Sequence, residues 1–206
     1  FSMKSKIVFG SMRMLEKNNT LRYWVDMFEF MYENGIREHH VSYEYESYDF
    51  YLDVLKVFQF KNPTKKLTYI CKLAEPSFDD LNFSRNRLKS KCAKYSADLG
   101  SNDLCIQWMT RYKLNELESR ISHLIDFCKN LDEEILELKE TKYINEFLVF
   151  PYSLPELDVY LEHKLLPHSN GYIVYCNLNE TEYGEKLMNC KSTNNTAIRP
   201  FQGRKS

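Results

Sequence analysis

Glycine is scarce in this sequence, with six residues among 206. No G-x-G-x-x-G follows the first predicted strand, and no G-x-x-x-x-G-K-[ST] occurs anywhere. Both loops need glycine because its missing side chain lets the backbone approach a phosphate closely. The sequence therefore argues against a Rossmann dehydrogenase with the dinucleotide fingerprint and against a P-loop enzyme.

Long apolar runs and an excess of one charge are also missing. The longest apolar stretches, near residues 7–9 and 147–152, have the length of strands, whereas a membrane-spanning helix needs roughly 20 apolar residues. The formal net charge is −1, which gives no electrostatic footprint for nucleic acid or for an anionic membrane. No secretory signal pattern opens the chain. We therefore expect a cytoplasmic protein without a nucleic-acid or membrane partner.

No pair of cysteines has the C-x-x-C spacing, and no histidine stands at a ligand spacing beside one. The six cysteines are Cys71, Cys92, Cys105, Cys128, Cys176 and Cys190. Most of them lie in apolar segments, and a chain with this much core needs no disulfide framework. We expect free, buried thiols.

The sequence does contain enough apolar residues to form the hydrophobic core of one domain. Of the 206 residues, 43% are hydrophobic, and the 15 tyrosines and 13 phenylalanines suit buried strands. Phe1 and Ser2 resemble the remnant of a cleaved expression tag before a native Met3. The domain is therefore expected to span residues 4–206.

Strand signals and helix signals alternate along the chain. Thr20 is suited to cap a helix whose apolar positions recur at helical spacing and which Asn34-Gly35 ends. Strands are predicted at residues 7–10, around 41, and at 67–71, 104–109, 147–150, 172–176 and 196–198. Further helices are predicted at 48–58, 83–99, 114–141, from Pro155 onwards, and at 182–190. About seven such units predict a parallel α/β sheet, which fits an open doubly wound sheet as well as a closed barrel.

The segment 114–141 carries the longest apolar stripe at helical spacing. The stripe favours packing against the sheet over a dimerising coil. A polar dip at Lys129-Asn130 predicts two helices in series. The acidic run 132–134 is predicted to be a solvated helix face.

The stretch from Asn34 to Lys72 carries a more specific pattern. The heptapeptide 40–46, His-Val-Ser-Tyr-Glu-Tyr-Glu, follows the second strand, and Cys-Lys ends the third. This pattern resembles the active-site half of the aldo/keto reductases, which carry Asp-Thr-Ala-x-x-Tyr-Gly and Thr-Lys at these places. Residues 197–203, Ala-Ile-Arg-Pro-Phe-Gln-Gly, resemble the family's Arg-Pro-Phe-x-Gly-Gly region. The resemblance implies a parallel (β/α) TIM-type barrel, which is incomplete if no eighth unit follows the seven visible ones.

The same resemblance implies chemistry for Tyr45 and Lys72. In the family, a tyrosine hydroxyl donates a proton to a substrate carbonyl while hydride arrives from a nicotinamide, and a lysine ammonium lowers the pKa of that tyrosine. Tyr45 and Lys72 are then the catalytic pair of an NADPH-dependent reductase of an aldehyde or ketone. Both lie at the carboxyl ends of predicted strands, where barrel active sites form. We expect the two side chains to converge there.

Two other catalytic positions of the family differ in this chain. His40 replaces the aspartate that would pair with Lys72, and the family's histidine on the fourth strand corresponds to Met109 or Thr110. A lysine ammonium close to His40 would lower the pKa of the imidazole. Because each positioned acid or base contributes about 10²–10⁴-fold, these losses are expected to lower the rate by orders of magnitude.

The positions that bind the cofactor in the family are only partly kept in this chain. The Ser-Asn that grips the nicotinamide amide in the family falls on residues 148–151, where Pro151 also removes a backbone donor. Asn177 lies near the glutamine expected under the nicotinamide, and Arg199 lies in the second matching motif. Asn177 and Arg199 are therefore the candidate cofactor-binding residues, although an ordinary loop cap accounts for Asn177 equally well.

Alternatives to the reductase stay open. A catalytically inactive barrel could bind a partner protein or a regulatory ligand, because fold does not fix function. An isomerase or lyase could use Lys72 to form a Schiff base. A metal site at His39 and His40 is disfavoured, because strand alternation puts the two rings on opposite faces. No pattern in the sequence sets the oligomeric state.

Overall fold

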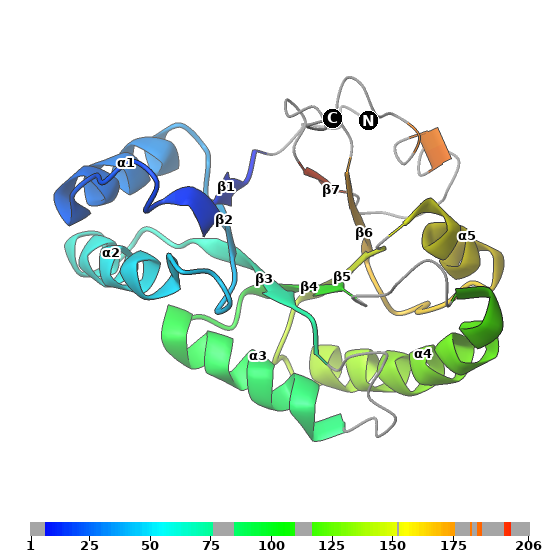
Figure 1. Cartoon of the computed structure of the whole chain (residues 1–206). Helices are drawn as coiled ribbons and strands as arrows, with labels where there is room; N and C mark the ends of the chain where they lie inside the picture. Colours follow the sequence, from blue (N-terminus) through cyan, green and yellow to red (C-terminus); the bar gives the residue numbers. More distant parts are fainter. Residues whose placement is uncertain are drawn as a thin grey trace.

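In the part of the chain that the structure describes, seven parallel strands lie in one sheet, in the same order as in the sequence. The strands are β1 (Phe9–Gly10), β2 (Glu38–Val41), β3 (Thr68–Leu73), β4 (Leu104–Met109), β5 (Glu146–Phe150), β6 (Gly171–Tyr175) and β7 (Thr196–Ile198). The computed structural model describes residues 7–75, 85–109, 117–151, 153–175, 182, 185–186 and 196–198. The sheet curls into an open ring with β1 and β7 at its two edges (Figure 1), which confirms the prediction of an incomplete (β/α) barrel.

The helices lie on the outer side of the curled sheet (Figure 1). They are η1 (Ser11–Arg13), α1 (Leu21–Glu33), α2 (Tyr48–Lys61), α3 (Arg85–Leu99), α4 (Leu117–Glu140) and α5 (Leu154–Glu162). A doubly wound sheet would carry helices on both faces, so this arrangement decides between the two predicted architectures. None of the helices in the described part of the chain has the length and apolar content needed to cross a membrane. The predicted helix at 182–190 lies largely outside the described residues.

Helix α1 begins and ends where the sequence predicts. The Oγ1 atom of Thr20 accepts a hydrogen bond from the backbone N–H of Tyr23 at 3.1 Å. At the other end Asn34 follows the last helical residue, and Gly35 has a φ of +84°, which glycine adopts without steric cost. Both ends of α1 are therefore set by residues within one turn of the helix.

Replacing Thr20 by alanine is expected to destabilise the protein by about 1 kcal/mol, because the N–H of Tyr23 loses its acceptor. Thr20→Ser keeps a hydroxyl at the same place and is the matched control. Urea unfolding followed by tryptophan fluorescence measures the free energy of unfolding of both variants. Equal midpoints for the two variants would contradict a stabilising cap.

Helix α4 is one continuous helix of 24 residues, so the prediction of two helices in series is wrong. Lys129 and Asn130 lie on its exposed face, where no apolar side chain is needed. Neither residue breaks a helix, and the Nδ2 atom of Asn130 donates to the carbonyl oxygen of Asp126 at 3.3 Å. The apolar stripe of α4 packs in the core, as predicted, through Leu124, Cys128, Leu131, Ile135 and Leu138.

The acidic run on α4 also differs from its prediction. Asp132 and Glu134 are buried, with 9% and 2% of their surfaces exposed, whereas Glu133 is exposed. Asp132 accepts two hydrogen bonds from His168, one from Nδ1 at 2.6 Å and one from the backbone N–H at 2.9 Å. The run is therefore not a solvated face, because Asp132 ties α4 to the loop before β6.

Strand alternation divides the sheet into an outer and an inner face. Outward side chains pack under the helices in the main core, and the Nδ1 atom of His39 lies there, 2.8 Å from the Tyr51 hydroxyl oxygen. The inner face holds a second apolar cluster, which we call the inner cluster: Ile70, Cys105, Leu148, Phe150 and Ile173. His40 points to the inner face, so the predicted separation of the two histidine rings is confirmed.

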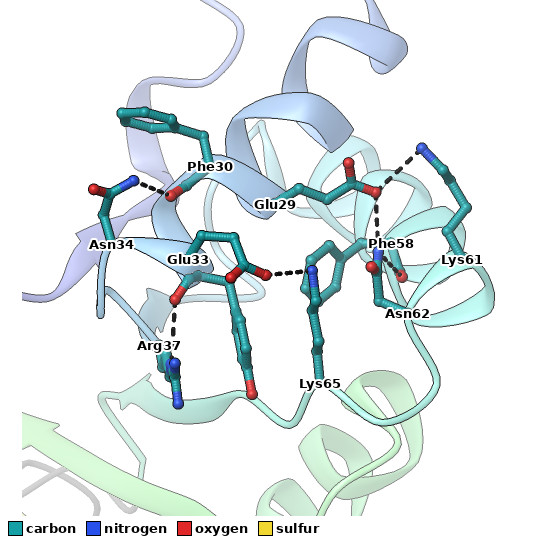
Figure 2. Close-up of polar contacts among 10 residues, drawn as sticks. Glu29, Phe30, Glu33, Asn34, Arg37, Phe58, Lys61, Asn62 and Lys65 are labelled. Atoms are coloured by element: carbon teal, nitrogen blue, oxygen red, sulfur yellow. Dashed lines mark hydrogen bonds and ion pairs between the residues drawn. The ribbon is translucent and has the colours of Figure 1, made fainter.

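Helices α1 and α2 are joined by a row of polar contacts (Figure 2). Glu29 accepts hydrogen bonds from Lys61 at 3.1 Å and from Asn62 at 3.0 Å, and Glu33 lies 2.6 Å from the Lys65 ammonium. The hydrogen bond from Asn62 is the main cause that lowers the pKa of the Glu29 carboxyl. Exposed pairs of this kind contribute about 0–1 kcal/mol each, so the packing of the two helices rests mainly on their apolar faces.

The described cysteines are free and buried, as predicted: Cys71, Cys92, Cys105 and Cys128. Burial raises the pKa of the Cys92 thiol to about 12. Little thiolate forms at neutral pH under these conditions, so this thiol is unreactive. Cys176 and Cys190 lie outside the described residues.

Candidate active site

Three neighbouring strands place polar side chains on the inner face of the barrel. Lys72 on β3 is the register partner of Gln107 on β4, and His40 on β2 is the partner of Ile70, two residues before Lys72. Residues of the same parity along paired strands face the same side, so His40, Lys72 and Gln107 all face the barrel interior. Gln107 is 3% exposed, while His40 and Lys72 are half-buried. These residues lie toward the carboxyl ends of their strands, where barrel active sites form.

Tyr45 reaches this group from the loop between β2 and α2. The loop turns back tightly, because the N–H of Tyr45 donates to the Ser42 carbonyl oxygen at 3.1 Å and the N–H of Glu44 donates to the Ser42 hydroxyl at 3.2 Å. The Nζ atom of Lys72 then lies 5.6 Å from the centroid of the Tyr45 ring, within the range of a cation–π contact. The predicted convergence of Tyr45 and Lys72 is confirmed.

His40 stands between Tyr45 and Gln107. Its Nδ1 atom lies 3.5 Å from the Tyr45 hydroxyl oxygen, at the long limit of a hydrogen bond. Its Nε2 atom is hydrogen-bonded to the Oε1 atom of Gln107. An amide oxygen only accepts, so Nε2 carries the proton, and a neutral His40 presents Nδ1 as an acceptor to the O–H of Tyr45.

The pKa of His40 is lowered, as predicted. Burial is the largest cause, the hydrogen bond to Gln107 opposes it, and the Lys72 ammonium adds to the decrease. Since this pKa lies below the usual value of about 6.5, the imidazole is neutral at neutral pH. The group formed by His40, Tyr45, Lys72 and Gln107, which we call the mouth group, therefore holds one positive charge beside neutral hydrogen-bonding side chains.

Gln107 is the member of the mouth group that the sequence did not reveal. The sequence points to Met109 or Thr110 on the fourth strand, but the residue that contacts His40 is Gln107. Met109 packs half-buried against the inner cluster, and Thr110 lies outside the described residues. The sequence did offer one signal for Gln107. Residues two apart on a strand face the same side, which puts Gln107 on the same face as Met109. The pairing with Lys72 follows only from the strand register.

Of the positions expected to bind the cofactor, the described residues include those at the end of β5. Asn177 and Arg199 lie outside the described residues. Phe150 is 3% exposed and belongs to the inner cluster, and Pro151 is buried. The carboxyl end of β5 therefore offers no side-chain amide at Phe150 and no backbone N–H at Pro151.

Metal ligands do not gather in the part of the chain that the structure describes, which contains no group of three or more His, Cys, Asp or Glu side chains suited to an ion. A cleft of about 480 Å³ lies at the other end of the sheet, lined in part by Leu67 and Tyr69 at the start of β3 and by Asp103 just before β4. Amino ends of barrel strands are associated with stability rather than with catalysis. We therefore assign the candidate active site to the mouth group.

The fold matches solved structures. An aldose reductase of Giardia lamblia matches with a TM-score of 0.61 at 16% identity, over 96% of this chain and 66% of that one. An aldo/keto reductase of Klebsiella pneumoniae in complex with NADP and acetate matches with a TM-score of 0.65 at 12% identity, over 93% of this chain and 62% of that one. The chain has the aldo/keto reductase fold. A Bombyx mori aldo/keto reductase in complex with NADP also matches, with a TM-score of 0.61 at 11% identity, over 95% of this chain and 62% of that one.

At this level of identity the aldo/keto reductase likeness concerns the fold. No protein-family profile matches the sequence, and no curated protein matches it either. This chain spans about two thirds of the length of the aldo/keto reductases named above, or slightly less. The resemblance carried by residues 40–46 and Lys72 is thus confirmed by architecture, while the roles of Tyr45 and Lys72 stay predictions.

Proposed function

We propose that this protein is a reductase of an aldehyde or ketone that uses NADPH. The observation that carries the proposal is the Lys72 ammonium 5.6 Å from the Tyr45 ring, at the mouth of an aldo/keto reductase fold. A phenol beside an ammonium is suited to release a proton, because the positive charge stabilises the phenolate. We therefore assign Tyr45 as the proton donor and Lys72 as its electrostatic partner.

The two residues act on the carbonyl oxygen of the substrate. Bound NADPH supplies the hydride that reduces the carbonyl carbon. Tyr45 donates its hydroxyl proton to the carbonyl oxygen, so that an alcohol forms and the tyrosine is left as a phenolate. The Lys72 ammonium stabilises this phenolate until it regains a proton. A positioned acid of this kind contributes about 10²–10⁴-fold to a rate.

Asn177 and Arg199 are the proposed contacts of NADPH. A side-chain amide suits the nicotinamide carboxamide, and a guanidinium suits a phosphate. The Klebsiella and Bombyx structures contain NADP, which supports this choice of cofactor. The end of β5 fits the nicotinamide less well, because Phe150 and Pro151 provide no polar group to hold its amide.

A second candidate is a non-catalytic barrel that binds a partner protein or a regulatory ligand. It is favoured by the buried Phe150 and Pro151 and by His40, which is a neutral imidazole where the family has a carboxylate. The two candidates differ in one necessary property, since only the reductase must bind NADPH.

Thermal unfolding in the presence of NADPH separates the two candidates. Binding at a hundredfold excess over Kd stabilises the native state by about 2.7 kcal/mol, which raises the Tm by several degrees. We expect such a rise for the wild type and a smaller one for Arg199→Ala. Arg22→Ala is the matched control, because Arg22 is exposed on α1. No rise at millimolar NADPH would eliminate the reductase and leave the binding barrel.

A further inference from the structure

His40 contacts Tyr45 through one ring nitrogen and Gln107 through the other. The contact with Tyr45 is 3.5 Å long and joins Nδ1 to the phenol oxygen. The contact with Gln107 joins Nε2 to the amide oxygen, and Gln107 is buried between the paired strands β3 and β5. The imidazole therefore links the phenol at the mouth to a fixed amide deeper in the barrel.

The surroundings of His40 determine which proton it can exchange. Among the described residues, Tyr45 in the loop and Lys72 on β3 are the titratable side chains that act on the ring, and β4 contributes the neutral Gln107. From η1, the Ser11 hydroxyl donates to the His40 carbonyl oxygen at 2.9 Å and does not reach the ring. Glu38, two residues back on β2, accepts from the Thr68 hydroxyl at 3.3 Å. The proton closest to Nδ1 is thus the phenol proton of Tyr45.

We infer that His40 is the proton partner of Tyr45, and that Gln107 is a positioning residue that keeps the bare Nδ1 of His40 turned towards the phenol. The inference rests on the proposed reductase function and adds a second proton transfer to it. It gives His40 a role that differs from that of a carboxylate at the same place, since a neutral imidazole accepts a proton and does not neutralise Lys72.

We call the transfer of protons between Tyr45 and His40 the relay, and it conserves protons and charge in both directions of the reaction. When an alcohol is oxidised, its hydroxyl proton moves to the Tyr45 oxygen and the phenol proton moves to Nδ1 of His40, while bound NADP would take up the hydride that leaves the carbinol carbon. When a carbonyl is reduced, the Nδ1 proton of the His40 imidazolium moves to the Tyr45 oxygen and the phenol proton moves to the carbonyl oxygen. Solvent then restores the proton of His40. Reduction through the relay therefore requires protonated His40.

The position of the His40 proton is measured on the free protein, without substrate. Long-range proton–nitrogen NMR spectra distinguish the two tautomers for each of the five histidines, and the spectrum of His40→Asn identifies the His40 signals. We expect the Nε2–H tautomer in the wild type. Gln107→Leu removes the acceptor and is expected to give a mixture, whereas Gln107→Glu keeps an oxygen acceptor and should keep Nε2–H. A wild-type protein with the proton on Nδ1 overturns the inference, whether or not it reduces carbonyls.

The proton transfer itself is measured by the pH dependence of reduction, with benzaldehyde as the probe. Above the lowered pKa of His40, the imidazolium becomes about tenfold scarcer with each pH unit, so the wild-type kcat should fall in parallel. His40→Asn keeps a hydrogen-bonding atom near the place of Nδ1 but takes up no proton. It is expected to be about 10²-fold slower at the acidic end and independent of pH.

The outcomes of the two experiments are separable. A His40→Asn variant that keeps the wild-type pH slope overturns the relay, because the slope then arises from a group other than His40. A wild type that fails to bind NADPH overturns the proposed reductase instead. In that case the NMR spectra still decide whether Gln107 fixes the His40 tautomer, since they need no cofactor.

Discussion

Tyr45→Phe is expected to lower the rate of NADPH-dependent carbonyl reduction by about 10²–10⁴-fold, because the reaction loses its proton donor. Phenylalanine keeps the aromatic ring that Lys72 approaches to 5.6 Å, so the local packing should persist. The binding of NADPH should be unchanged, and the loss should fall on kcat. Steady-state kinetics with an aldehyde, together with thermal titration with NADPH, measure these two effects separately.

Tyr23→Phe is the matched control for this experiment. Tyr23 lies on α1 with 43% of its surface exposed, and its hydroxyl should contribute nothing to kcat. Lys72→Met is expected to resemble Tyr45→Phe, because the phenolate then forms without a neighbouring positive charge. Full activity of Tyr45→Phe would remove Tyr45 from the reaction and contradict the proposed mechanism.

Trp108→Ala is expected to destabilise the protein by about 3–5 kcal/mol, the largest effect on stability that we expect from a single substitution. Trp108 is completely buried on the outer face of β4. It stacks on Phe127 of α4, with ring centroids 5.9 Å and planes 17° apart, and it also approaches Phe147 of β5 at 6.4 Å. Truncation leaves a cavity between the sheet and α4, and urea unfolding followed by circular dichroism measures the loss.

Phe60→Ala is the control for the Trp108 experiment. Phe60 belongs to α2 but is 88% exposed, so its removal should change the free energy of unfolding by no more than about 0.5 kcal/mol. If Trp108→Ala cost no more than this control, the described packing of β4 under α4 would be contradicted.

The sequence predicts most of the elements because their signals are local. The cap at Thr20, the left-handed Gly35 and the proline near the start of α5 each act within about one turn of a helix. The alternation of strands and helices then implies a parallel sheet. The curl into a barrel does not follow from these signals. It was predicted only from the resemblance of residues 40–46 and Lys72 to the aldo/keto reductases.

Contacts between distant residues account for what the sequence does not predict. His40 and Gln107 are 67 residues apart, and their hydrogen bond depends on the register of three strands. Asp132 has the pattern of a surface residue, yet His168, 36 residues later, covers it. Charge and periodicity describe one residue and its neighbours along the chain, so they do not predict contacts between residues that are far apart in the sequence. The sequence therefore pointed to His40, Tyr45 and Lys72, whereas Gln107 and its hydrogen bond to His40 were not predictable.

Among the residues that the structure describes, each strand of this sheet pairs only with the strands that precede and follow it along the chain. A strand that leaves the ribosome therefore meets a neighbour that has already been made, and never waits for a distant one. From β2 to β6, the described residues between consecutive strands contain one helix each, α2 to α5, and such short connections keep the entropy of closing each loop small. We expect the sheet to assemble co-translationally, one strand at a time from β1 towards β7.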